Sequence, residues 1–98
     1  MTITKKQNGA NLEIILEGRL DTTTAPELEQ ELKQGLNDIE TLTLDFSKVE
    51  YVSSAGLRVL LYAQRHMSSK GSMKVTHPNE IVMEVFEVTG FADVLTIE

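Results

Sequence analysis

Apolar positions along the chain recur with two periods, one typical of a strand and one typical of a helix. In residues 11–18 the apolar side chains Leu12, Ile14 and Leu16 occupy every second position, which indicates a strand with one buried face. In residues 54–68 the apolar positions recur every three or four residues, which indicates an amphipathic helix. Over the whole chain, these periods predict strands at 2–7, 11–18, 41–46, 72–76 and 93–98 and helices at 21–37, 54–68 and 80–91.

The order of the predicted elements favours an α/β fold. Each helix follows a strand, which predicts parallel strands joined by right-handed crossovers. The turn signal Asn8-Gly9 joins the first two strands, so the first strand should pair antiparallel at the edge. We therefore expect a single domain over residues 1–98, with a mixed, mostly parallel sheet, an antiparallel N-terminal edge strand and three main helices.

Two predictions concern the ends and faces of the helices. Thr24 and Glu27 have the spacing of a capping box, which predicts that the Thr24 side chain caps the first helix. In the third helix, Ile81, Val85 and Val88 share one stripe with Val82 and Phe86 beside it, and we expect this apolar face to pack into the core. Gly90 should end that helix.

Composition and charge narrow the function classes. The chain has 98 residues, 41% of them apolar, a net charge of −6 and no cysteine. Its nine Lys and Arg residues are scattered, which disfavours binding to nucleic acid or to an anionic membrane. The lack of cysteine excludes disulfides and thiolate chemistry. No apolar run is long enough for a membrane span and none resembles a leader, so we expect a cytoplasmic protein.

The segment YVSSAGLR at 51–58 carries the main candidate chemistry, because it places Ser53 and Ser54 before a predicted helix. A nucleophilic serine needs a base, and the segment lacks the G-x-S-x-G elbow. His66 lies three turns further along the helix, and His77 lies beyond another strand. The histidines and carboxylates show no metal-ligand spacing, and no phosphate-binding loop is present. We therefore predict no catalytic residue, no metal site and no cofactor.

Local chemistry leaves two roles open for Ser54. Serine is a preferred N-cap residue, so it could simply begin the second helix. A helix N-terminus also favours a phosphate, because its free N–H groups and its dipole attract an anion. A phosphate would add about −1.5 to −2 charge beside the small residues Ala55 and Gly56, and so could block a docked partner.

Three segments give the chain a resemblance to a known family. They resemble the conserved blocks of the STAS domain family, the anti-sigma factor antagonists and their relatives. In chain order, which is also the family order, they are LEGRLDTTTAPELEQEL, LTLDFSKVEYVSSAGLRVLL and VMEVFEVTGFADVLTI. The resemblance covers almost the whole chain. It implies a STAS-like fold and the function of an antagonist that binds an anti-sigma factor and so releases a sigma factor.

The resemblance also implies partners and site residues. The anti-sigma factor of such systems is a serine kinase that inactivates the antagonist by phosphorylation, and a metal-dependent serine phosphatase restores it. The phosphorylated position matches Ser54, and Asp21 matches an acidic position beside it. The partner-binding surface would comprise Asp21, Thr22, Ser53, Ser54, Gly56, Leu57 and Arg58.

The chain departs from the family pattern around the acceptor. Many phosphorylated members read Asp-Ser-Ser-Gly or Asp-Ser-Thr-Gly, whereas this chain has Ser53 in place of the aspartate and Ala55 in place of the second hydroxyl residue. The missing carboxylate motivates an alternative hypothesis, in which the protein is an unphosphorylated STAS adaptor in a signalling or stress-response assembly.

Overall fold

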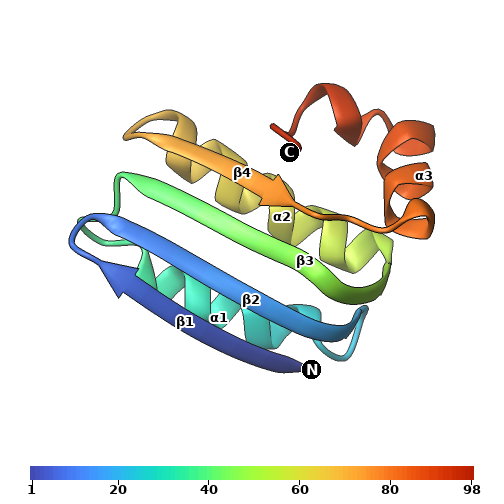
Figure 1. Cartoon of the computed structure of the whole chain (residues 1–98), viewed down its shortest axis with the longest axis horizontal. Coiled ribbons are helices and arrows are strands. Elements are labelled where there is room, and N and C mark those ends of the chain that lie inside the picture. Colours follow the sequence, from blue (N-terminus) through green and yellow to red (C-terminus); the bar gives the residue numbers. More distant parts are fainter.

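A single four-stranded sheet organises the computed structural model, which describes residues 1–98. The strands lie in the order β1-β2-β3-β4, with β1 antiparallel to β2 and the other pairs parallel (Figure 1). The strand bounds are β1 Thr2–Asn8, β2 Asn11–Leu20, β3 Thr41–Val52 and β4 Ser72–Thr76. The predicted mixed sheet with its antiparallel N-terminal edge strand is therefore confirmed.

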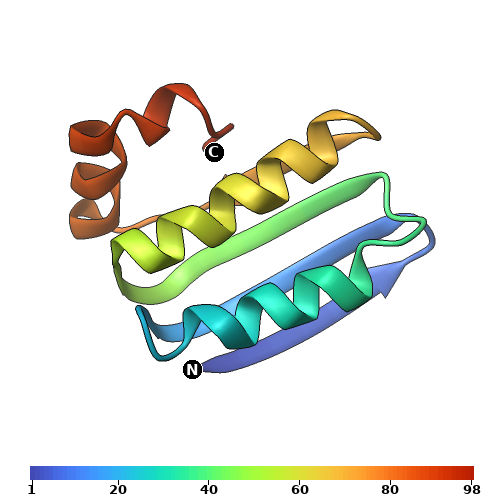
Figure 2. The same cartoon turned by 180° about the vertical axis from the view of Figure 1, so that it is seen from behind.

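Three α-helices flank the sheet unequally. Helices α1 (Ala25–Gly35) and α2 (Ser54–Ser68) lie side by side across one face (Figure 2). Helix α3 (Glu80–Thr89) stands beyond the end of β4, and a short 3-10 helix, η1 (Phe91–Asp93), follows it (Figure 1). The other face of the sheet carries no helix. The three predicted helices are confirmed, and α2 has the predicted bounds.

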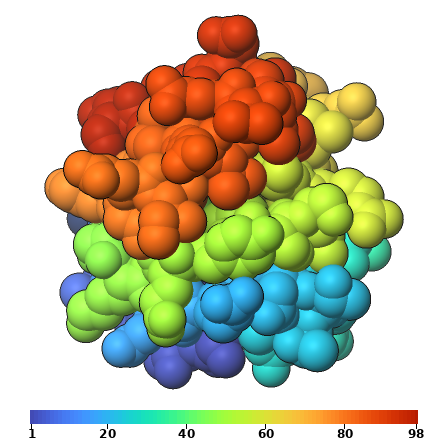
Figure 3. All heavy atoms as spheres, turned by 90° about the vertical axis from the view of Figure 1, so that its right-hand side faces the viewer, coloured from blue at the N-terminus to red at the C-terminus, as the bar shows by residue number.

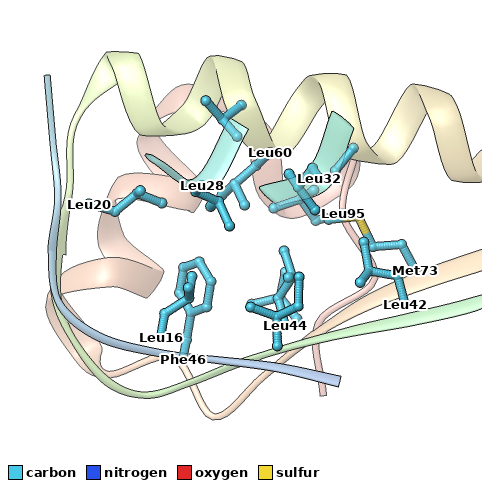
Figure 4. Packing of buried hydrophobic residues seen from close by; sticks show 14 of the residues in the cluster. Leu16, Leu20, Leu28, Leu32, Leu42, Leu44, Phe46, Leu60, Met73 and Leu95 are labelled. Carbon is cyan, nitrogen blue, oxygen red and sulfur yellow. The ribbon is translucent and has the colours of Figure 1, made fainter. Parts of the chain in front are cut away.

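Most of the core lies between the sheet and the pair α1 and α2, and it extends to Val82 and Phe86 of α3 and to Leu95. It is one cluster of 24 buried residues, all of them apolar. Strand residues such as Leu16, Leu44 and Phe46 point toward helix residues such as Leu28 and Leu60 (Figure 4). Every second position of β2 and β3 and one stripe of each helix supply these side chains, as the two apolar periods require.

Strand β3 extends six residues beyond its predicted end at position 46. Its register against β2 shifts twice, between Ile15 and Glu17 and between Gly18 and Arg19 of β2. Next to the first shift, the Asp45 carboxylate accepts the Ser47 N–H at 2.9 Å. The extra residues break the strict alternation of apolar positions, which is why the sequence pattern ended the strand too early.

The predicted last strand at 93–98 is wrong in its extent. Residues 91–93 form η1 instead, and only a single bridge joins Ile97 to Val75 of β4. The terminal segment nevertheless lies beside β4, because Val75 donates to the Thr96 carbonyl at 2.8 Å and Glu98 donates to the Val75 carbonyl at 2.9 Å. The predicted strand is therefore confirmed only as a single bridge.

The predicted core face of α3 is wrong in part. Val82 and Phe86 are fully buried, whereas Ile81 is 57% exposed and Val88 is 79% exposed. The helix carries two adjacent apolar stripes, and helical spacing alone cannot choose between them. Phe86 packs against Phe46 of β3, with ring centroids 6.2 Å apart, and this contact selects the buried stripe. Gly90 ends the helix with a φ of 84°, as predicted.

Candidate functional site

The two hydroxyl-rich loops meet at the carboxyl end of the sheet. The Ser53 N–H, at the end of β3, donates to the Leu20 carbonyl, at the end of β2, at 2.9 Å. The surface at this end shows the loop after β2, the loop after β3 and helix α3 in successive bands (Figure 3). The two loops are therefore neighbours, as expected for loops at the carboxyl ends of adjacent parallel strands.

Asp21 organises the first of these loops. Its carboxylate accepts the Thr23 N–H at 3.0 Å, the Thr23 hydroxyl at 2.8 Å and the Thr24 N–H at 3.2 Å. These bonds, led by that of the Thr23 hydroxyl, hold the pKa of the Asp21 carboxyl below its ordinary value of 3.8. Asp21 therefore shapes the loop at the position where the family resemblance places an acidic residue.

The predicted capping box of α1 is wrong. Thr24 occupies the N-cap position, but its side chain makes no cap hydrogen bond. Its hydroxyl instead donates to the Arg19 carbonyl at 2.7 Å and accepts the Asp21 N–H at 2.8 Å. The Thr24 hydroxyl thus bonds within the turn around Asp21 instead of capping the helix. The helix begins at Ala25 rather than at the predicted position 21.

Replacing Asp21 by alanine should lower stability in a pH-dependent way. Because folding lowers the pKa of this carboxyl, its ionised form stabilises the native state above about pH 4 and this contribution is lost as the pH falls through the folded pKa. The melting temperature of Asp21→Ala should therefore lie below that of the wild type at neutral pH, and the gap should narrow at about pH 3. A gap that stays constant between these pH values would contradict this role.

The two serines have different environments. Ser53 is the N-cap of α2 with extended backbone, its side chain makes no cap hydrogen bond, and its Oγ is buried without a partner. Ser54 is the first residue of the helix and is exposed to solvent. The N-cap role that we considered for Ser54 thus belongs to the backbone of Ser53. An exposed hydroxyl at a helix N-terminus remains, which is accessible to a modifying enzyme.

Neither serine should contribute much to stability. We expect Ser53→Ala and Ser54→Ala each to change the free energy of unfolding by less than about 0.5 kcal/mol, because no cap bond is lost. Asn79→Ala is a matched control, since the Asn79 side chain does cap α3 by accepting the Val82 N–H at 2.8 Å. It should cost about 1 to 2 kcal/mol in urea unfolding, because its amide also donates to the Val49 carbonyl. Equal losses in all three variants would contradict this assignment.

Not all of the predicted surface residues are at the surface. Gly56 and Leu57 are buried beneath the loop, whereas Thr22, Ser54 and Arg58 are exposed. A Cβ atom on Gly56 would lie 2.7 Å from Leu20 Cγ and 2.9 Å from the Leu20 carbonyl oxygen. Gly56 therefore allows α2 to approach the end of β2 closely.

A groove of about 300 Å³ lies beside the serines, between the N-terminal turns of α1 and α2. It brings together Thr22 and Arg58, two residues of the predicted surface. Five further lining residues were not predicted, namely Ala25, Pro26, Glu29, Ala55 and Val59. Ala25 and Glu29, like Ala55 and Val59, are four residues apart on their helices, and this spacing is the signal that could have placed each pair on one face.

The surroundings of Ser54 include one cationic side chain. Arg58 lies one turn after Ser54, on the same side of α2, and supplies a cation near the Ser54 hydroxyl. No group of three or more His, Asp or Glu side chains is arranged to hold a metal ion. None of the helices is long and apolar enough to cross a membrane.

Comparison with protein families gives one match over nearly the whole chain, to the model described as "Mlab, STAS domain", at residues 3–96. BtrV of Bordetella bronchiseptica, named as a candidate anti-sigma factor antagonist, is 32% identical over 99% of this chain and 85% of its own length. The anti-sigma-B factor antagonist of Bacillus subtilis is 27% identical over 94% of this chain and 85% of its own length.

Solved structures share the fold at lower identity. The anti-sigma factor antagonist SpoIIAA in its unphosphorylated form superposes with a TM-score of 0.82 at 18% identity, over 99% of this chain and 88% of that one. The phosphorylated form of the Bacillus protein SpoIIAA gives a TM-score of 0.77 at 16% identity, over 99% and 91% of the two chains. At these identities the likeness concerns the fold alone.

Proposed function

The chain belongs to the STAS domain family, and from this premise we propose that it is an anti-sigma factor antagonist controlled by phosphorylation of Ser54. The observation that carries the proposal is the exposed Ser54 hydroxyl at the first residue of α2, beside a groove between two helices. The antagonist function is supported by the names of relatives that align over nearly the whole chain.

In the proposed cycle, the unphosphorylated protein binds an anti-sigma factor through the loops after β2 and β3. Binding to the anti-sigma factor releases its sigma factor. The anti-sigma factor is also the serine kinase that modifies Ser54, and a metal-dependent serine phosphatase removes the phosphate. We place the whole cycle in the cytoplasm, and none of its steps requires this chain to bind nucleic acid.

The proposed switch depends on local electrostatics. The N-terminus of α2 carries free N–H groups that stabilise an anion, so a phosphate on Ser54 leaves the fold intact. Arg58 adds a cation one turn away. The phosphate would instead weaken partner binding. Its charge of about −1.5 to −2 would have to be desolvated at an interface that fits the neutral serine.

In this proposal the protein acts as a regulator and not as an enzyme. A nucleophilic Ser54 would need a base within hydrogen-bond reach. His66 lies on the same helix, about 18 Å further along its axis at the usual rise per residue. Turnover of a generic ester that disappears in Ser54→Ala would contradict this part of the proposal.

The antagonist function is tested by competition. Unphosphorylated protein added to a preformed complex of the cognate anti-sigma factor and its sigma factor should displace the sigma factor, as followed by size-exclusion chromatography. Ser72→Asp, a change at the opposite end of the sheet, should displace it equally well. A complex that remains intact at saturating antagonist would overturn the proposal.

The unphosphorylated adaptor is a second candidate, favoured by Ser53. Its Oγ is buried and without a partner at the position where many phosphorylated members carry a carboxylate. An adaptor would be recovered from cells in a large assembly without a kinase-type partner. Recovery of the kinase with the wild type, and its loss in Ser54→Asp, would exclude this candidate.

A further inference from the structure

Helix α3 exposes an apolar stripe that nothing in the structure covers. Ile81 is 57% exposed, Val88 is 79% exposed, and the half-buried Val85 lies between them. The spacing places the three residues on one face of the helix. They line a shallow groove of about 290 Å³ together with Glu84 and Thr89. The groove shares no residue with the one beside Ser54.

The charged residues of the chain segment that carries this stripe are all acidic, although Glu98 pairs with Lys74 at 3.6 Å. All nine Lys and Arg residues of the chain lie in residues 1–74, whereas residues 75–98 contain none. The five acidic residues of that last segment are Glu80, Glu84, Glu87, Asp93 and Glu98. Almost the entire net charge of −6 therefore resides in the quarter of the chain that includes α3.

We infer that α3 is a second docking surface, which binds a basic amphipathic helix of a protein partner. Ile81, Val85 and Val88 lie on successive turns of α3 and so can pack against the apolar face of another helix. Glu84 and Glu87 lie on the same side of the stripe and match Lys or Arg along one edge of that face. A second copy of this chain is disfavoured as the occupant, because two α3 helices would oppose their acidic residues.

The groove on α3 shares no residue with the groove beside Ser54, so we expect it to hold a partner while the Ser54 loop is blocked. Its test therefore needs neither the kinase nor the sigma factor. The probe is a synthetic Leu/Lys amphipathic helical peptide, titrated into the isotope-labelled full-length chain and followed by NMR. Saturable shift changes should concentrate on the amides of Glu80–Thr89.

Variants separate the two components of the surface. Ile81→Ser/Val88→Ser removes the exposed apolar area and should weaken peptide binding by about tenfold or more. Glu84→Gln/Glu87→Gln should weaken it several-fold and reduce its dependence on salt. Val94→Ser is the matched control, because Val94 is also 46% exposed but does not line the groove. It should bind like the wild type.

Three outcomes would overturn the inference. Shift changes confined to other elements would place the binding site elsewhere. Equal binding of a Leu/Glu peptide would show that the acidic flank plays no part. Concentration-dependent dimerisation in sedimentation, lost in Ile81→Ser/Val88→Ser, would identify the occupant as a second copy.

Discussion

Ser54→Asp should bind the anti-sigma factor about 100-fold more weakly than the wild type, whereas Ser54→Ala should bind normally. The aspartate places a charge on the exposed first residue of α2, in the middle of the proposed contact surface. Burying that charge against a partner that offers no matching cation costs several kcal/mol. A loss of about 2.7 kcal/mol corresponds to a 100-fold increase in Kd. Isothermal titration calorimetry measures both affinities.

The fold of Ser54→Asp should be unaffected, because an acidic residue is favourable in the first turn of a helix. Its melting temperature should therefore equal or slightly exceed that of the wild type. Ser72→Asp adds the same charge at the start of β4, at the other end of the sheet, and should bind normally. Equal weakening in both variants would indicate a general effect of charge and not a switch at Ser54.

Gly56→Ala should destabilise the protein by about 2 kcal/mol, although it adds only one methyl group. The new Cβ atom would lie 2.7 Å from the Cγ atom of Leu20, which is fully buried. It would also lie 2.9 Å from the Leu20 carbonyl oxygen, which accepts the hydrogen bond from Ser53. Either the helix moves away or the bond between the two loops lengthens. Urea unfolding measures the loss.

Gly35→Ala is the matched control, since Gly35 also lies in a helix but has open space where its Cβ would be. It should leave stability unchanged or raise it by about 0.5 kcal/mol, because alanine favours helix more than glycine does. In Gly56→Ala, displacement of the loop should also weaken partner binding. Equal unfolding free energies for the two variants would show that the contact with Leu20 does not matter.

The sequence predicted the architecture because the core depends on regular periods. The alternating apolar residues of β2 and the helically spaced apolar residues of α2 each predicted one apolar face, and the structure buries both faces. The predictions failed where a single contact decides between two patterns. The Thr24 hydroxyl hydrogen-bonds within the turn around Asp21, and α1 begins only at Ala25. The contact between Phe46 and Phe86 decides which of two apolar stripes of α3 is buried.

The candidate site was predictable in its location and less so in its surface. The carboxyl ends of parallel strands brought the loops after β2 and β3 together, as expected. Sequence could not show that Gly56 faces Leu20 and not the solvent, because a glycine carries no side chain with which to mark a face. Nor could it show that Ser53 takes the N-cap position and leaves Ser54 exposed.

Phosphate mapping on the two serines is the most direct test of the proposed switch. The wild type, Ser53→Ala and Ser54→Ala are each incubated with the cognate anti-sigma kinase and Mg-ATP, and the products are analysed by tandem mass spectrometry. We expect one phosphate on Ser54 in the wild type and in Ser53→Ala, and none in Ser54→Ala. A phosphate on Ser53, or no phosphate on a wild-type protein that binds the kinase, would contradict control through Ser54.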